Sequence, residues 1–404
     1  MTRRLAFLAA AAAAWGAAAW FLWQTTVVPS SLHLPHVDQH AFFTDAQIHA
    51  ASSFSRVEDL LFWGTTLLQI AALAAFARWG VRWSRESAAG PIGTGMLLGM
   101  LGFALVWVVQ LPLEVVGLWW QRHHHLSRVS YPSFLFGDWF ALAGEFVFLC
   151  FALAIVMGLA RRFRDTWWIS AAPAFIGLAL LFAFVSPYLI TTHRLQNASL
   201  QTIASQLEKK EGVGHVPIEV EDIHDVTSLP NSEAAGLGPS RRVIIFDTML
   251  DGRFTTGELK VVIGHELGHL ARHHIWKDVG WYALFAFPGL FLVAQATKLR
   301  GGLREPAAVP LALLAIVVLQ LLALPLQNAI SRHMEAEADW MSLRTTRDPK
   351  DAIQLFRRFV PTTLDEPDPS TFDYLMLEDH PTIVQRIAMA EAWRRYATSA
   401  AQSP

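Results

Sequence analysis

Residues 262–270 read VIGHELGHL, and this stretch predicts both a helix and a metal site. His265 and His269 are four residues apart, so on a helix their imidazoles lie on one face, about 5–6 Å apart at Cβ, and can share one tetrahedral Zn²⁺. Glu266 lies beside them, where its carboxylate is placed to take a proton from a water activated by the metal. The apolar residues around the motif indicate a buried helix face. We therefore expect a zinc-dependent hydrolytic site on a packed helix.

A third ligand is expected on another helix downstream, where residues 331–339 read SRHMEAEAD. Glu335 and Asp339 are four residues apart and face the same side. We predict that Glu335 binds the zinc and that Asp339 holds a ligand imidazole by its second nitrogen. Glu337 points elsewhere, and we interpret it as a surface or structural carboxylate. The alternative for the whole stretch is an ordinary acidic helix face, but the intact His-Glu-x-x-His motif favours the metal site.

Three segments together resemble the membrane-embedded CAAX prenyl endopeptidase family, which also includes bacterial heat-shock membrane proteases. They are residues 265–269 (HELGH), 331–339 (SRHMEAEAD) and 380–387 (HPTIVQRI). Residues 243–250 also resemble the strand that precedes the zinc helix in that family. The resemblance implies that His380, in the His-Pro motif, approaches the site and stabilises the oxyanion.

Residues 231–236 (NSEAAG) lie where that family carries a segment along the substrate edge. The resemblance implies that Asn231, Ser232, Glu233 and Ala234 bind the substrate peptide. The peptide is then expected to add as an extra strand, so that the enzyme binds the peptide's backbone more than its side chains. The chain departs from the family pattern at the second position, where Ser232 replaces an alanine.

Composition independently predicts a membrane protein. Hydrophobic residues make up 53% of the 404 and charged residues 16%, against roughly 45–50% and 25% in soluble globular chains. Seven charge-poor runs are each long enough to cross a bilayer core of about 30 Å. These runs are residues 5–23, 60–77, 92–113, 139–160, 167–190, 279–297 and 307–327. We interpret the first as a retained anchor rather than a cleaved signal peptide. The net charge of −2 does not indicate the basic surface that binding to nucleic acid requires.

The predicted fold class is a mostly α-helical integral membrane protein of about seven transmembrane helices, with a small α+β zincin-like metalloprotease domain. In the polar part of the chain, residues 200–211 have a helical pattern, and residues 217–223 and 241–250 have the pattern of strands. We divide the chain into an N-terminal membrane domain (1–192), a zincin-like catalytic segment (193–278), two transmembrane helices (279–328) and C-terminal catalytic helices (329–404).

The carboxylates Glu114 and Glu145 fall within or at the end of predicted spans, where charge is costly unless it faces protein or water. The family resemblance implies a water-filled chamber enclosed by the spans, which both could line. The alternative is an interfacial Glu114 and a helix-pairing Glu145.

The sequence gives two conflicting predictions for the side of the membrane on which the zinc domain lies. The basic residues of the short loops place the N-terminus in the cytoplasm and the zinc domain outside it, by the positive-inside rule. The resemblance, taken from eukaryotic members of the family, implies a cytosolic zinc domain instead. The chain is rich in Ala and Arg and poor in Lys, which is typical of a high-GC bacterium and therefore of a bacterial inner membrane.

The favoured function is an integral-membrane zinc endopeptidase with one Zn²⁺ per chain, acting on a peptide or protein substrate in contact with the lipid bilayer. The alternative is a catalytically inactive zinc-binding membrane scaffold or receptor. Glu266 argues against this alternative, because a structural zinc site needs no base and is normally closed by four protein ligands. The substrate is left open between prenylated proteins and membrane-protein quality control.

Overall fold

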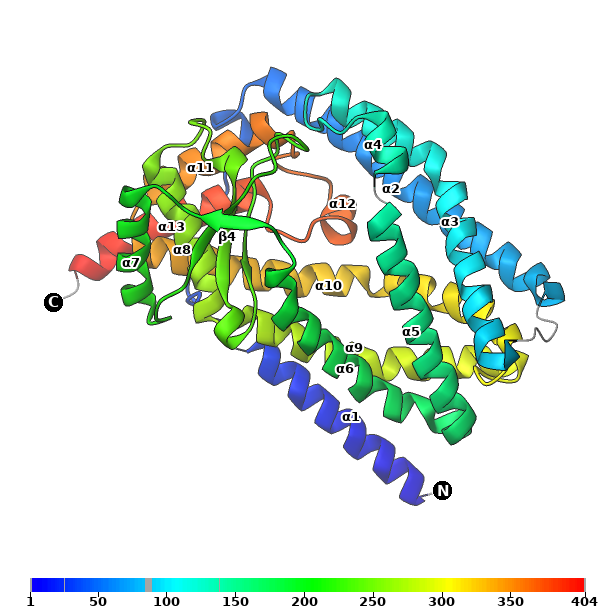
Figure 1. Ribbon diagram of the computed structural model, residues 1–404. Helices are drawn as coiled ribbons and strands as arrows, with labels where there is room; N and C mark the ends of the chain where they lie inside the picture. Colours follow the sequence, from blue (N-terminus) through cyan, green and yellow to red (C-terminus); the bar gives the residue numbers. More distant parts are fainter. Residues whose placement is uncertain (1, 25, 84–88, 138, 403–404) are drawn as a thin grey trace. The chain divides into compact units, whose positions relative to one another are not determined.

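The computed structural model describes residues 2–24, 26–83, 89–137 and 139–402 (Figure 1). The chain forms two compact units. The first, here called the sheet unit, comprises Met1–Val57, Leu180–Trp281 and Leu324–Pro404. The second, the helix unit, comprises Glu58–Ala179 and Tyr282–Ala323. Each unit contains its own cluster of buried apolar side chains.

Most of the described chain is helical. The long helices are α1 (Thr2–Trp23), α2 (Asp45–Trp79), α3 (Gly90–His123), α5 (Trp139–Phe163), α6 (Trp167–Val185), α9 (His274–Thr297) and α10 (Val309–Thr346). A short helix, α4 (Tyr131–Phe136), follows α3. Large apolar side chains such as Leu60, Val147 and Leu322 are about 70% exposed on these helices, as lipid-facing residues are expected to be.

Five helical stretches of the described residues are long and apolar enough to cross a membrane. They are Asp45–Trp79, Gly90–His123, Leu142–Tyr188, His274–Arg300 and Pro306–Thr346. The third contains two helices, α5 and α6, with a 3-10 turn at Arg164–Thr166 between them. The predicted run 5–23 forms helix α1 but is not among the five stretches. The prediction of a multi-pass membrane protein is confirmed, whereas the count of seven spans is not.

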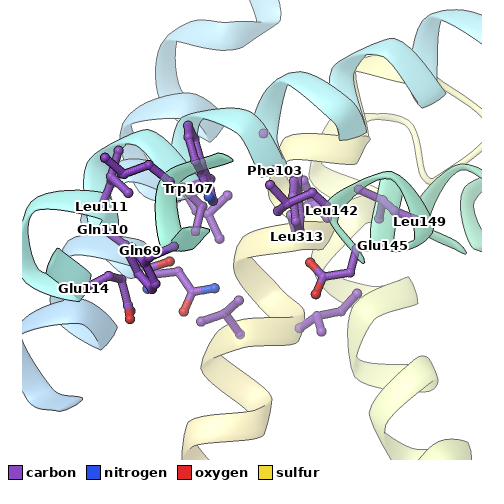
Figure 2. Close-up of a pocket in the computed structure, with 17 residues that line it drawn as sticks. Gln69, Phe103, Trp107, Gln110, Leu111, Glu114, Leu142, Glu145, Leu149 and Leu313 are labelled. Atoms are coloured by element: carbon purple, nitrogen blue, oxygen red, sulfur yellow. The ribbon is translucent and has the colours of Figure 1, made fainter. Parts of the chain in front are cut away.

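The helix unit contains a cavity of about 500 Å³. Its wall is mostly leucine and aromatic side chains, but it also carries the carboxylates of Glu114 and Glu145 and the amides of Gln69 and Gln110 (Figure 2). The amide of Gln110 donates a hydrogen bond to the backbone oxygen of Thr65 at 3.2 Å. Of the two interpretations of these carboxylates, their position agrees with the one in which both line a cavity.

The sheet unit is built on a four-stranded mixed sheet in the order β1-β2-β4-β3. Its strands are β1 (Thr192–Arg194), β2 (Ile218–Glu221), β3 (Ser232–Ala235) and β4 (Arg242–Phe246). Strands β2 and β4 run parallel, and β1 and β3 pair antiparallel on either side of them. Val243, Ile244 and Ile245 are completely buried, which explains why the apolar strand β4 takes a central position. Strand β3 is an edge strand, so one side of its backbone is left unpaired by the sheet.

Five further helices belong to the same unit. They are α7 (Ala198–Glu211), α8 (Thr256–Ala271), α11 (Pro349–Thr363), α12 (Thr371–Met376) and α13 (Ile383–Gln402). Helix α8 carries the His-Glu-x-x-His motif and packs against α7, α11, β3 and β4. It begins with a capping box in which Thr255 and Glu258 each accept a hydrogen bond from the other's backbone N–H. Glu258 is buried and also pairs with Arg358 of α11 at 3.1 Å, so the start of the motif helix is fixed.

Two glycines let α10 approach α8 closely. A Cβ at Gly264 would lie 3.0 Å from Ser342 Oγ, and a Cβ at Gly268 would lie 3.0 Å from Met341 Cβ and 3.2 Å from the backbone oxygen of Ala338. Real Cβ contacts are rarely so short, and the oxygen of Ala338 belongs to a helix backbone that cannot easily move. These glycines therefore bring the histidine-bearing helix against the helix that carries Glu335.

Candidate active site

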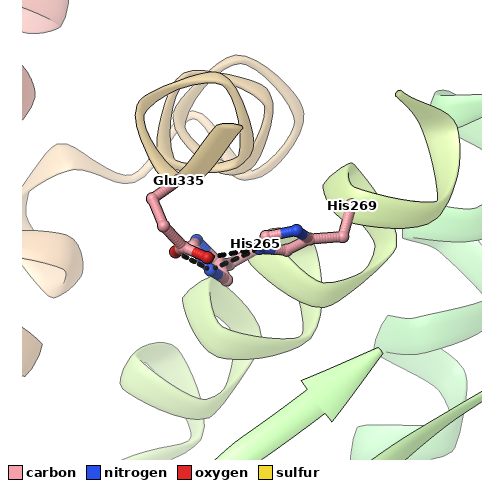
Figure 3. A group of neighbouring side chains, drawn as sticks. All are labelled: His265, His269 and Glu335. Carbon is pink, nitrogen blue, oxygen red and sulfur yellow. Dashed lines mark hydrogen bonds and ion pairs between the residues drawn. The ribbon is translucent and has the colours of Figure 1, made fainter. Parts of the chain in front are cut away.

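Three side chains from α8 and α10 converge on one point (Figure 3). The Nε2 atoms of His265 and His269 lie 3.0 Å apart. The carboxylate of Glu335 lies 3.1 Å from His265 Nε2 and 3.3 Å from His269 Nε2. One donor atom from each residue lies within 4.8 Å of the other two, the grouping expected of a metal site. The spacing of two histidines on one helix and a carboxylate on another thus places all three predicted ligands together.

The second ring nitrogen of His265 is hydrogen-bonded to a carboxylate that an arginine fixes in place. His265 Nδ1 donates to Asp339 Oδ1 at 2.9 Å. Arg386 of α13 donates to both oxygens of Asp339, at 2.7 and 2.8 Å. Burial lowers the pKa of His265, but the hydrogen bond to Asp339 and the negative charges of Glu335 and Asp339 outweigh burial and raise it to about 10 in the metal-free protein. The imidazole is therefore oriented with Nε2 toward the cluster, as the sequence predicted for the partner of Asp339.

The second ring nitrogen of His269 is held by another histidine. His269 Nδ1 lies 2.9 Å from His274 Nδ1, and His274 Nε2 donates to Glu337 at 2.9 Å. Lys277 donates to the same oxygen of Glu337 at 2.7 Å. Glu337 is completely buried, so of the two interpretations of this residue the surface one is wrong and the structural one holds. Its role is to anchor the chain of hydrogen bonds that orients His269.

The donor set fits a zinc ion. Because both Nδ1 atoms are hydrogen-bonded to protein, both Nε2 atoms are available to the metal. Glu335 Oε2 is buried and lies 3.1 Å from His265 Nε2 and 3.3 Å from His380 Nε2, yet it accepts no well-aligned hydrogen bond from the described residues. Two imidazoles and one carboxylate are the ligand set of zinc hydrolases that keep a fourth position open.

Glu266 lies in the same cavity as the cluster. The cavity has a volume of about 340 Å³ and is lined by His265, Glu266, His269 and Glu335, by Asn231 to Ala234, and by Asp339, His380 and Arg386. Glu266 is buried, and Ser232 Oγ of the edge strand β3 donates to its Oε1 at 2.7 Å. A carboxylate next to the ligands but outside the ligand set has the position required of a general base.

His380 reaches the cluster from the loop between α12 and α13. Its Nε2 lies 3.3 Å from Glu335 Oε2, and its Nδ1 bonds to Asp379 at 2.7 Å. Burial lowers the pKa of His380, but the hydrogen bond to Asp379 and the charge of Glu335 outweigh burial and raise it. A protonated imidazole is a strong donor toward developing negative charge.

Several contacts of this site are not predicted by the sequence. Arg386 enters the prediction only as part of the His-Pro motif. Ser232 is predicted to bind substrate, but its hydrogen bond to Glu266, 34 positions away, is not predicted. Asp379 precedes His380 directly, so the pair Asp-His was a local signal that could have been read. Lys277 offered no such signal, because its partner Glu337 lies on another helix.

Comparison with known families gives a match over residues 194–394 to the model described as peptidase family M48. The matched region contains the ligand cluster, Glu266 and His380. The chain belongs to peptidase family M48. It is a metalloprotease, and its long apolar helices make it a multi-pass membrane protein.

Similar proteins agree with this assignment. The chain is 23% identical over 396 residues to the uncharacterized metalloprotease YhfN of Bacillus subtilis, covering 92% of each protein. It is 26% identical to a protease HtpX homolog of Ligilactobacillus salivarius, over 61% of this chain and 93% of that protein. The fold matches the crystal structure of S. mikatae Ste24p with a TM-score of 0.69 at 16% identity, over 94% of this chain and 96% of that one.

Proposed function

We propose that this metalloprotease is a zinc endopeptidase, with one Zn²⁺ held by His265, His269 and Glu335. The observation that carries the proposal is the convergence of these three side chains beside Glu266 in one cavity of the sheet unit. A zinc ion held by these three residues would supply Lewis acidity, which would polarise a scissile carbonyl and lower the pKa of a water molecule toward about 7.

The chain's own residues then move the proton. Glu266 takes it from the attacking water and passes it to the leaving amine, as a general base that becomes a general acid. Ser232 fixes the carboxylate of Glu266 by donating to Oε1. The other oxygen, Oε2, can then accept the proton. His380 donates to the developing oxyanion, an assignment supported by its approach to Glu335 at 3.3 Å.

Substrate binding is proposed along β3. The unpaired edge of this strand borders the cavity through Asn231, Ser232, Glu233 and Ala234. An extended peptide pairing with this edge would present its backbone carbonyls to the cluster. The bilayer-embedded helices indicate that the substrates include membrane proteins, and we propose a quality-control role in a bacterial inner membrane. The four predicted segments, 1–192, 193–278, 279–328 and 329–404, remain the proposed domain division.

Glu266→Gln tests whether the protein is an enzyme or an inactive scaffold. The variant keeps the size of the side chain and removes the base, so hydrolysis of an unstructured peptide should fall by about 10²–10⁴-fold. Bound zinc, measured by elemental analysis, and the melting temperature should stay near wild type. Wild-type activity in Glu266→Gln would mean that the cleavage belongs to another site or to a contaminant.

The matched comparison is Glu335→Ala, which removes a ligand instead of the base. It should lose both zinc and activity, because a three-ligand site cannot spare one ligand. Full zinc content in Glu335→Ala would show that the ligand set is assigned wrongly.

A further inference from the structure

One face of α10 carries four buried polar side chains. They are Asn328, Arg332, Glu335 and Asp339, and each is 5–8% exposed. Their spacings of four, three and four residues put them on a single stripe of the helix. Glu335 and Asp339 are explained by the metal cluster. Asn328 and Arg332 lie outside the cavity wall and have no part in the chemistry described above.

The stripe faces a single stretch of the C-terminal segment, residues 374–386. Asn328 donates to the backbone oxygen of Leu375 at 3.3 Å. Arg332 Nη1 donates to the backbone oxygens of Tyr374, at 2.7 Å, and of Glu378. One turn further along the helix Glu335 meets His380, and one turn beyond that Asp339 meets Arg386.

Arg332 holds its partners by more than one interaction. Its guanidinium carbon lies 4.2 Å from the centre of the Tyr374 ring, a distance typical of a cation–π contact. The Tyr374 hydroxyl donates to Gln385 at 3.0 Å, which ties the same residue to the start of α13. The carbonyls that Arg332 binds lie at and beyond the end of α12, where a helix leaves its last carbonyls without partners.

Arg332 and the two carbonyls that it binds, here called the clamp, lie close to His380 along the chain. Two residues of extended chain span at most about 7 Å, so fixing the carbonyl of Glu378 confines His380 to the vicinity of the cluster. We infer that Arg332, assisted by Asn328, is a positioning residue for His380: the stripe on α10 sets the register in which the loop presents this histidine to the metal ligands. The inference rests on the catalytic role of His380 proposed above.

Arg332→Met is the variant that tests the inference, since it keeps an unbranched side chain and removes the donors. We expect kcat to fall about 10²-fold, as for His380→Ala, with KM and zinc content near wild type. Hydrogen–deuterium exchange of residues 371–382 should rise. Arg344→Met, an exposed arginine on the same helix, is the control and should change none of these quantities.

A double-mutant cycle separates positioning from a general loss of structure. If Arg332 acts through His380, Arg332→Met combined with His380→Ala is no slower than His380→Ala alone. Additive losses, or an unchanged kcat in Arg332→Met, would overturn the inference. An unchanged kcat in His380→Ala would overturn the proposed role of that histidine, and unaltered exchange of residues 371–382 would overturn the clamp itself.

Should Arg332→Met not fold, Asn328→Ala replaces it in the same cycle. This variant removes one hydrogen bond to the loop, so the expected loss in kcat is about 3–10-fold, corresponding to a bond of about 1 kcal/mol. It should again disappear in the His380→Ala background, and a loss that persists there contradicts positioning.

Discussion

The two ligand histidines are oriented by partners of different character. His265 donates to the carboxylate of Asp339, whose two oxygens both accept hydrogen bonds from the half-buried Arg386, whereas His269 bonds to a second imidazole. A carboxylate partner raises the basicity of a ligand imidazole. His269 receives this effect only through His274, which passes it on from Glu337. The basicity of His265 is therefore raised by a carboxylate directly, and that of His269 only through a second imidazole. Removing Asp339 should weaken metal binding more than removing Glu337.

Another buried carboxylate, Glu211 at the end of α7, makes stability depend on pH. Burial raises its pKa from 4.5 to about 7, partly opposed by Thr345 and by the charge of His265. A carboxyl whose folded pKa is raised binds its proton more tightly in the folded state, so the free energy of unfolding falls as pH rises from 4.5 to about 7. The loss amounts to at most about 3 kcal/mol.

Glu211→Gln should remove this loss, because glutamine does not ionise. We expect the melting temperature of the detergent-solubilised, metal-free variant to exceed that of wild type by a few degrees at pH 8 and to differ little at pH 4.5. Glu305→Gln, at an exposed position, is the control. An equal difference at both pH values would show that packing, not ionisation, is responsible.

At the scale of single residues, the sequence predicted those parts of the site that helical spacing determines. His265, Glu266 and His269 share one helix, and Glu335 and Asp339 share another, so their mutual placement needs no knowledge of the fold. Arg386 and Ser232 act across elements that only tertiary packing brings together. The roles of all these side chains in the reaction stay predictions until the variants are measured.

At the scale of elements, the approach of α8 to α10 controls the geometry of the ligands. Gly268→Val places a branched side chain against the backbone of α10, where a Cβ alone would be 3.2 Å from the oxygen of Ala338. Separating the helices should cost about 1–3 kcal/mol and weaken zinc binding, measured by competition with a chromophoric chelator.

The control for this variant is Gly289→Val in α9, because a Cβ at Gly289 has no atom within 4 Å. It should leave the zinc affinity unchanged. An unaltered affinity in Gly268→Val would mean that the helix separation does not determine the placement of Glu335.

Elements with a clear hydrophobic period were predicted closely, whereas the shortest strand was not. The expected helix at 200–211 is α7 (Ala198–Glu211), and the expected strands at 217–223 and 241–250 contain β2 and β4. Strand β1 has three residues and only one partner strand, too few to carry an alternating pattern.

At the scale of the whole molecule, the basic residues of the short loops predict that the zinc domain lies outside the cytoplasm. Cys150 is the single cysteine, so a Cys150→Ser background allows site-specific labelling. A membrane-impermeant maleimide should label Ser199→Cys, at an exposed position in the sheet unit, in intact cells. Asp165→Cys, in the turn between α5 and α6, should react only after permeabilisation. The reverse pattern would establish the cytosolic orientation.

The free edge of β3 also affects what happens after the peptide bond is cut. Backbone pairing along an edge strand is the same for a product as for a substrate, so a cleaved fragment that keeps its paired stretch keeps most of its affinity. Release of the fragment would then limit turnover, as it does in many enzymes. Progress curves should therefore slow well before the substrate is consumed, and one of the two product peptides, added separately, should inhibit competitively. Linear progress curves that are insensitive to added product would mean that the strand edge contributes little to holding the peptide.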